Sequence, residues 1–251
     1  MRIQVVTHPE YRQLHDELTL LPQHFEEEGT IVYQGRNLIK ALRIGGTLRN
    51  VKSFKIPHWL NRFVYAYFRP SKAKRSFTYA NLLLAKGIGT PCPIAYLVER
   101  SFWGIRRSYY VSEQVAFDYE FRDLRVQNPP DLEAILRAFT RFTWQFHQAG
   151  IYFIDHSPGN TLIQREEEGY RFYLVDLNRM KFKHITPYKG LKNFYRLNAT
   201  DEMIAVIADE YARLTHSDAT RMTSLLKKWT HRHDRQVQKQ IEKRNAKKAF
   251  P

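Results

Sequence analysis

Two stretches of the sequence decide the fold: residues 147–160, HQAGIYFIDHSPGN, and residues 174–178, LVDLN. The first follows a helical pattern and places Asp155 five positions before Asn160, with a Ser-Pro-Gly run between them. Such an aspartate and asparagine can simply make turn contacts through their side chains, so the pair alone is not specific. The second stretch is an apolar run that leads into Asp176. The three residues, taken together with the helix before them, favour a functional site over an ordinary turn.

Upstream of these stretches, the chain reads as an antiparallel meander. Its expected strands are residues 30–33, 38–44 and 48–55. Residues 34–37 and the pair Gly45-Gly46 separate them, and glycine supplies the positive backbone angles that tight hairpin turns need.

A helix and two more strands complete this first region. Residues 71–86 predict a helix that stops at Gly87, because glycine commonly ends helices and prolines follow here at 91 and 93. Residues 93–99 and 108–115 are typical of strands. The sequence therefore predicts a small region of five antiparallel strands and one helix, over residues 1–115.

The rest of the chain, residues 116–251, is mainly helical in pattern. The most periodic helix follows residues 128–131 and ends at Gly150, with apolar residues at helical spacing on one face: Leu132, Ile135, Leu136, Phe139, Phe142 and Phe146. Loops and short strands are expected around a hairpin at residues 166–169. From about residue 227 the sequence is strongly basic, which we interpret as a solvated tail. The fold class is α+β.

Composition restricts the classes of partner and compartment. A formal charge of +15 favours polyanions such as nucleotide phosphates, nucleic acid or anionic lipid headgroups. The single cysteine, Cys92, excludes an internal disulfide and fits a reducing compartment, so cytoplasm is expected. Residues 1–21 lack the apolar core of a signal peptide. No apolar stretch approaches the roughly 20 residues of a spanning helix, so any membrane contact would be peripheral.

The 147–160 stretch resembles the catalytic loop of kinase-like phosphotransferases, in which an aspartate precedes an asparagine by five positions. The 174–178 stretch resembles the metal-binding aspartate of the next hairpin, with Leu177-Asn178 where protein kinases have Phe-Gly. The motif Ser-Pro-Gly-Asn, followed by Val-Asp-Leu-Asn-Arg-Met, most resembles the corresponding motifs of the bacterial lipopolysaccharide core kinases, which phosphorylate Kdo or heptose sugars. The resemblance covers about residues 29–197.

This resemblance implies a bilobal, protein-kinase-like fold and an ATP-dependent kinase that transfers phosphate to an alcohol group. Asp155 would orient the acceptor hydroxyl and accept its proton, whereas Asn160 and Asp176 would supply oxygen ligands to Mg²⁺. The acceptor would be a lipid-linked or phosphorylated sugar. The enzyme would act in the cytoplasm, at the inner face of the inner membrane, with the basic surface touching anionic lipid.

The ATP-binding residues are expected on the strand meander. Gly35 lies in the best candidate for a phosphate-covering turn, although the sequence has no complete glycine-rich motif. Lys52 is preceded by valine on the third strand, as in the strand lysine that neutralises nucleotide phosphates, and Lys55 is the alternative. Backbone groups at Glu113 and Val115 would hold adenine.

Other functions stay open at this stage. The helix between Pro70 and Gly87 has no acidic residue, whereas kinases usually place there a glutamate that pairs with the strand lysine. Lys52 would then be unpaired, or held through Tyr79 or Asn81. This departure favours a catalytically silent kinase fold that serves as a binding scaffold, and an atypical protein kinase is a further alternative. A nucleic-acid-binding protein ranks last, and we expect no nucleic acid partner.

Overall fold

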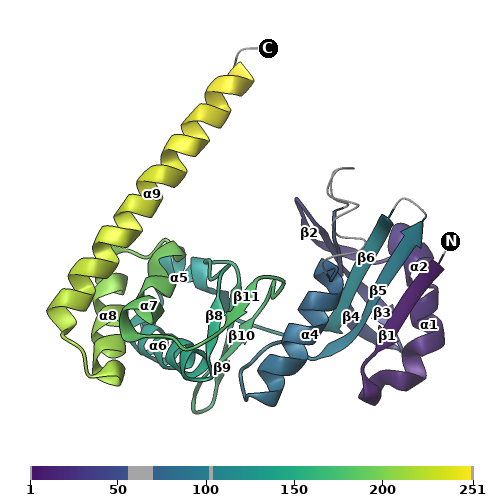
Figure 1. Cartoon of the computed structure of the whole chain (residues 1–251), viewed down its shortest axis with the longest axis horizontal. Coiled ribbons are helices and arrows are strands. Elements are labelled where there is room, and N and C mark those ends of the chain that lie inside the picture. Colours follow the sequence, from purple (N-terminus) through teal and green to yellow (C-terminus); the bar gives the residue numbers. More distant parts are fainter. Residues whose placement is uncertain (1, 56–69, 102–103, 250–251) are drawn as a thin grey trace. The chain divides into compact units, whose positions relative to one another are not determined.

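The chain forms two compact units in its computed structural model, which describes residues 2–55, 70–101 and 104–249. The first unit comprises Met1–Ala116 together with Asp176–Asn178, and the second comprises Phe117–Val175 and Arg179–Pro251. Each unit has its own buried apolar core. Figure 1 labels the helices and strands of both.

An antiparallel sheet of six strands is the main feature of the first unit, counted over the described part of the chain. The strands follow one another across the sheet in the order β1-β5-β6-β4-β3-β2. Their bounds are β1 Arg2–Thr7, β2 Thr30–Gln34, β3 Leu38–Ile44, β4 Thr47–Ser53, β5 Pro93–Ser101 and β6 Gly104–Glu113. The expected meander is therefore present in β2, β3 and β4.

The turn between β3 and β4 shows why glycine is needed there. Ile44 pairs with Thr47, which leaves only Gly45 and Gly46 to reverse the chain, and their φ angles are +59° and +75°. Two positive φ angles in a two-residue loop match the twist of the flanking strands, and residues with side chains rarely adopt them. This turn sets the register that brings Lys52 opposite Ile39.

The N-terminal residues correct the expected count of five strands and one helix. β1 adds a sixth strand by pairing with β5, with Val5 opposite Leu97. After it come the 3₁₀ helix η1 (Pro9–Leu14), α1 (His15–Thr19) and α2 (Leu21–Glu27). Local sequence does not reveal β1 because its partner strand lies far along the chain. The side chains of Leu18, Leu21 and Phe25 bury their apolar surface in the core beneath the sheet.

The expected helix of the first unit is α4, Lys72–Ala85. Ser71 caps it, since the Ser71 hydroxyl accepts a hydrogen bond from the backbone N–H of Lys74 at 3.1 Å. The helix ends before Gly87, which has a φ of +69°. Its buried Ala73 packs in a cluster with Phe54 of the segment after β4 and with Tyr96 of β5.

The second unit is mainly helical. Its helices are α5 Phe121–Gln127, α6 Leu132–Gln148, α7 Pro187–Lys192, the 3₁₀ helix η2 Asn193–Arg196, α8 Asp201–Thr215 and α9 Ala219–Ala249. The short strands are β7 Tyr119–Glu120, β8 Ile151–Phe153, β9 Thr161–Glu166, β10 Gly169–Leu174 and β11 Met180–Phe182. They form the ladders β10-β9-β7 and β11-β8, both antiparallel.

The core of this unit follows the apolar face predicted for α6. Ile135, Leu136, Phe139 and Phe146 are almost fully buried, and α8 contributes Ile204, Ile207 and Tyr211 from the other side.

Helix α9 begins as part of the second unit's core and continues beyond it. Met222 and Leu226 are buried, whereas residues from 235 to 246 are exposed, and Figure 1 shows this half of α9 projecting from its unit. The segment from residue 227, expected as a solvated tail, is instead helical and packs against the unit at its start, where Thr230 is buried and Trp229 contacts the core, so it is solvated only from about residue 235. Within the described ranges, no helix combines the length and the apolar character that crossing a membrane requires.

Candidate active site

The loop between β8 and β9 carries Asp155 and Asn160 and belongs to the second unit. The Asn160 side-chain amide donates to the backbone carbonyl of Asp155 at 2.8 Å, and the Asn160 N–H donates to the carbonyl of Ser157 at 3.0 Å. These bonds close the expected Ser-Pro-Gly turn. Because Nδ2 of Asn160 makes the bond inside the loop, its Oδ1 is the atom that would be offered to a cation.

Two buried histidines, His147 and His156, lie next to this loop. His147, at the end of α6, makes 3.0 Å hydrogen bonds to the Tyr211 hydroxyl and to Oδ1 of Asn193. Asn193 in turn donates to the Phe153 carbonyl at 2.7 Å, just before Asp155. Burial lowers the pKa of His147 to about 4. The ring is therefore neutral near pH 7, and its role is to join α6 and α8 to the loop.

His156 directly follows Asp155 and has two plausible roles in the sequence, contact with substrate or packing under the loop. Its side chain is fully buried, with Phe139, Phe153 and Phe194 within 6 Å between ring centroids. Burial lowers the pKa of His156 to about 3. The structure therefore shows packing.

The carboxylate of Asp155 is held by two arginines that sequence reasoning did not single out. Arg179 lies 3.0 Å from Oδ1 of Asp155 and Arg196 lies 3.7 Å from the same atom. Arg196 also donates to the carbonyl of Ile154 at 3.1 Å. Arg179 immediately precedes β11, and Arg196 ends η2. The Asp155 side chain remains 18% exposed, so an acceptor hydroxyl could still reach it.

Asp176 belongs to the first unit, together with Lys52 of β4. Nζ of Lys52 lies 2.6 Å from Oδ1 of Asp176, and the Asn178 side-chain amide donates to that same oxygen at 2.7 Å. Asp176 has a φ of +59°, a left-handed conformation that aspartate adopts more readily than most residues. Both bonds end on Oδ1, so Oδ2 is the oxygen that would be offered to a cation.

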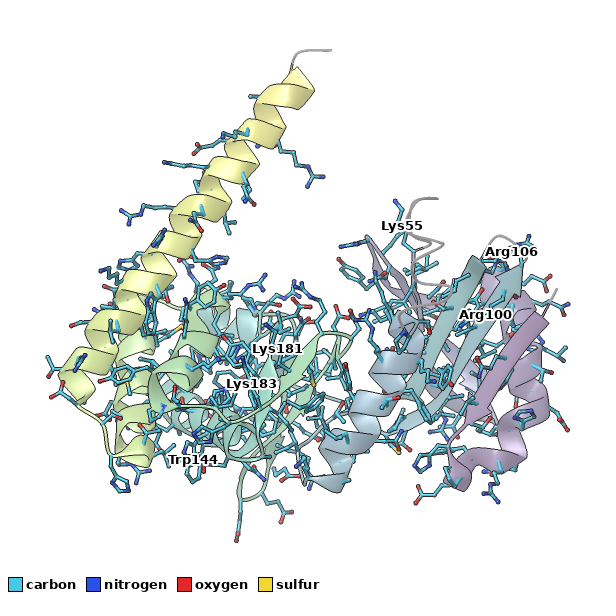
Figure 2. The ribbon with its side chains drawn as sticks, in the orientation of Figure 1. Lys55, Arg100, Arg106, Trp144, Lys181 and Lys183 are labelled. Atoms are coloured by element: carbon cyan, nitrogen blue, oxygen red, sulfur yellow. The ribbon has the colours of Figure 1, made fainter. Side chains whose placement is uncertain are left out.

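This ion pair corrects one expectation about Lys52. Lys52 is not unpaired, because Asp176 is its partner, and the Asn81 amide donates to the Phe77 carbonyl instead of holding Lys52. The structure also distinguishes Lys52 from the alternative, Lys55. Lys55 is exposed beyond the end of β4 (labelled in Figure 2).

The remaining predicted residues lie elsewhere in the first unit. Gly35 forms the turn between β2 and β3, where its N–H donates to the Asn37 carbonyl at 3.1 Å. A Cβ at Gly35 would meet the ring of Tyr33, an exposed side chain that can move aside. Glu113 ends β6, and Val115 lies just beyond it in a segment without regular structure.

An unexpected contact fixes Glu113. The Tyr11 hydroxyl donates to Oε1 of Glu113 at 2.7 Å, and Arg49 approaches that oxygen at 3.3 Å. Burial, helped by this hydrogen bond, raises the pKa of Tyr11, so the hydroxyl keeps its proton. The N-terminal helix η1 therefore ties down the end of β6.

The side-chain oxygen of Asn160, in the second unit, and the carboxylate oxygen of Asp176, in the first, are each of the kind that a hard cation such as Mg²⁺ prefers. In the described part of the chain, no group of three or more histidine, cysteine, aspartate or glutamate residues could hold a metal.

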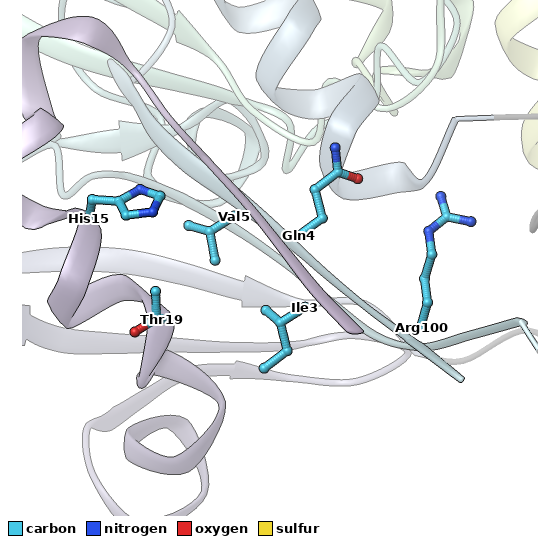
Figure 3. Close-up of a pocket in the computed structure, with 6 residues that line it drawn as sticks. All are labelled: Ile3, Gln4, Val5, His15, Thr19 and Arg100. Carbon is cyan, nitrogen blue, oxygen red and sulfur yellow. The ribbon is translucent and has the colours of Figure 1, made fainter. Parts of the chain in front are cut away.

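A separate cavity of about 590 Å³ lies in the first unit, as Figure 3 shows. It is lined by Ile3, Gln4 and Val5 of β1, His15 and Thr19 of α1, and Arg100 of β5. None of the predicted site residues lines it. We therefore do not assign the cavity to the candidate active site.

Comparison with known proteins identifies the fold and the family. A solved structure described as "WaaP in complex with acyl carrier protein" matches with a TM-score of 0.61 at 18% sequence identity, covering 94% of this chain and 99% of that chain. At that identity the likeness concerns the fold, and it confirms the expected α+β, kinase-like class.

The family follows from the sequence match. The model of the lipopolysaccharide kinase (Kdo/WaaP) family matches residues 56–225, more than half of the chain. The chain belongs to this family, as the resemblance predicted. No curated protein matches the chain. The family match includes Asp155, Asn160 and Asp176 but begins after Lys52, whose place in the site rests on the contact with Asp176.

Proposed function

We propose that the chain uses ATP and Mg²⁺ to phosphorylate a hydroxyl group on a sugar of the lipopolysaccharide core or of a related lipid-linked glycan. The observation that carries this proposal is the 2.6 Å ion pair between Lys52 and Asp176. Phosphoryl transfer requires a cation beside the phosphates and a carboxylate to hold the metal, and here both lie together. Membership of a lipopolysaccharide kinase family narrows the acceptor to a sugar.

Asp155 would bind the hydroxyl group of the acceptor. Its carboxylate would orient the hydroxyl and accept the proton as the oxygen attacks the γ-phosphate of ATP. The hydrogen bond from Arg179 fixes the direction of this carboxylate, and the Asn160 amide fixes the backbone of the same residue. A carboxylate held from two sides needs little reorganisation when the acceptor binds.

Asn160 and Asp176 would hold the metal, and Lys52 would share its charge between Asp176 and the nucleotide. Mg²⁺, when bound, supplies neutralisation of the phosphate charge that develops during transfer. Gly35 would let the β2–β3 turn approach the phosphates, and backbone groups at Glu113 and Val115 would bind adenine. The Tyr11 contact with Glu113 supports this last assignment because it immobilises the end of β6.

The surface around Asp155 favours an acceptor that carries negative charge. Besides Arg179 and Arg196, the second unit carries exposed lysines on β11, which pairs with the strand before Asp155, and after it: Lys181 and Lys183 (labelled in Figure 2), and Lys189. The pKa of Lys183 is lowered, first by its contact with Lys189, which shows how closely these cations are placed. A sugar with a carboxylate or phosphate group would neutralise them.

A location at the cytoplasmic face of the inner membrane would fit a lipid-linked acceptor. The exposed half of α9 carries Arg235, Lys239, Lys243 and Arg244 against Glu242. Basic residues close to an anionic lipid surface each contribute about 1 kcal/mol of attraction. We propose peripheral contact with such a surface, and no nucleic acid partner.

A catalytically silent scaffold is the second candidate function, and one observation favours it: α4 has no acidic residue to pair with Lys52. The pairing with Asp176 weakens this argument, since Lys52 is held in place by another residue. An atypical protein kinase differs from the first proposal only in its acceptor.

The decisive experiment measures ATP consumption with Mg²⁺ and a panel of Kdo- and heptose-containing lipid acceptors. Asp155→Asn keeps the side-chain shape and removes the base, and Asp209→Asn, an exposed aspartate of α8, is the matched control. We expect acceptor-dependent turnover in the unmodified protein and in the control, and its loss in Asp155→Asn. Calorimetric ATP binding without turnover would establish the scaffold, and phosphate transferred to protein would establish a protein kinase.

A further inference from the structure

Lys72 is a partly buried cation that the proposed mechanism does not use. It is the first residue of α4, directly after the capping Ser71. Its Nζ lies 5.9 Å from the centroid of the Phe54 ring, and Nζ of Lys52 lies 5.6 Å from the same centroid. Two ammonium groups from different elements therefore approach one aromatic ring. A ring attracts a cation only weakly, by about 0.5–1 kcal/mol at an exposed site, so it does not explain why both are there.

Charges from several elements act on Lys72. Its pKa is lowered, chiefly by burial and next by Arg36, and Arg75 and Lys52 add to the effect, whereas Asp176 acts in the opposite direction. Arg36, Arg75 and Lys52 therefore all act on Lys72, and the Asp176 carboxylate acts against them. Placing the partly buried Lys72 close to Lys52 is costly unless an anion neutralises this second charge as well. This arrangement is what a polyanionic ligand would require.

The origin of these cations identifies the ligand class. Lys52 is the proposed phosphate-binding lysine, and Arg36 lies in the β2–β3 turn next to Gly35. Both therefore belong to the elements to which the ATP phosphates are assigned. Lys72 adds a third element, the start of α4, where the aligned backbone N–H groups of a helix also favour negative charge.

We propose that Lys72 is a second phosphate-binding lysine, which contacts the β- or γ-phosphate of ATP beside Lys52. This inference rests on the proposed function. It also explains why α4 has no glutamate that pairs with Lys52. Asp176 already holds Lys52, so α4 can contribute a cation instead of a carboxylate. The helix would then act on the nucleotide directly rather than through Lys52.

Calorimetric titration of the full chain with Mg²⁺-ATP and with AMP tests the assignment. Lys72→Met keeps the apolar stem on Phe54 and removes the charge, and Lys74→Met, an exposed neighbour on the same helix, is the matched control. Loss of one charge-assisted hydrogen bond should weaken ATP binding about 10-fold or more. AMP, which lacks the β- and γ-phosphates, should bind equally well to all three proteins.

Three results would overturn the proposal in distinguishable ways. ATP affinity unchanged in Lys72→Met would remove Lys72 from the phosphate site and leave the proposed function intact. Equal losses for ATP and AMP, with a lower unfolding midpoint, would make Lys72 a structural residue. Failure of the unmodified protein to bind ATP at all would overturn the proposed function, and the assignment of Lys72 with it.

Discussion

Lys52 and Asp176 form an ion pair at 2.6 Å although 124 positions separate them in the sequence. The Lys52 side chain is only 11% exposed, whereas that of Asp176 is 31% exposed. A lysine with so little contact with water keeps its charge at lower cost when an anion faces it. The pair therefore explains how Lys52 is positioned in a chain whose α4 helix lacks a carboxylate.

Removing this lysine should abolish catalysis with little effect on folding. We expect Lys52→Met to lower kcat by at least about 100-fold, because the phosphates lose their main cation. Asp176 then loses its partner, but its exposure to water keeps the loss of stability small. Lys55→Met is the control, since Lys55 is exposed at the end of the same strand. A Lys52→Met protein with normal acceptor-dependent turnover would contradict the assignment of Lys52.

The arginines at Asp155 should act on the acceptor and not on ATP. We expect Arg196→Gln and Arg179→Gln to raise the KM for a sugar acceptor that carries a carboxylate or phosphate by about 10-fold, the effect of one lost charge-assisted contact. The affinity for ATP should stay the same. Steady-state kinetics with a charged acceptor, beside a neutral analogue where turnover allows it, measure this difference.

Arg171→Gln is the matched control for these variants. Arg171 is an exposed arginine of β10 and pairs with Glu166 at 2.6 Å, away from Asp155. Acceptor KM values that stay equal across all four proteins would show that the basic surface does not select the acceptor. A parallel loss of ATP affinity in Arg179→Gln would instead indicate that this arginine belongs to the nucleotide site.

Local sequence patterns were enough for the features that depend on neighbours in the chain. The Gly45-Gly46 turn fixes the β3–β4 hairpin, and the apolar spacing from Leu132 to Phe146 fixes α6 and its buried face. The spacing of Asp155 and Asn160 likewise requires only a five-residue turn, which the structure contains. Each of these features involves short-range geometry that a few residue types control.

Features that depend on distant partners could not be predicted from the local sequence. β1 is a strand because it pairs with β5, which lies far along the chain. The sequence pattern of a six-residue segment does not reveal such a partner. The contacts of Arg196 with Asp155 and of Tyr11 with Glu113 depend on tertiary packing in the same way. The chain has 40 lysines and arginines, so composition could not distinguish the few that face a carboxylate from the many that are solvated.

The two buried histidines predict that the protein loses stability as the solution becomes mildly acidic. The pKa of His147 falls from 6.5 to about 4 on folding and that of His156 to about 3, in both cases mainly through burial. Between these values and 6.5 the unfolded chain binds protons that the folded chain excludes. The free energy of unfolding therefore rises with pH in this window. The rise ends above about pH 6.5, where the histidines of the unfolded chain are also neutral. For His147 alone, the loss between pH 7 and pH 5 should be about 2 kcal/mol.

Urea unfolding of the unmodified protein, His147→Gln and His184→Gln at pH 7 and pH 5 measures this linkage. His147→Gln should be less stable at pH 7, since its bonds to Tyr211 and Asn193 are disturbed, but it should lose less stability on acidification. His184 is exposed, so His184→Gln should follow the unmodified protein. Equal unfolding free energies at the two pH values in the unmodified protein would mean that the histidines accept protons without cost. The aromatic packing of His156 and the hydrogen bonds of His147 could then not be what holds the loop that carries Asp155.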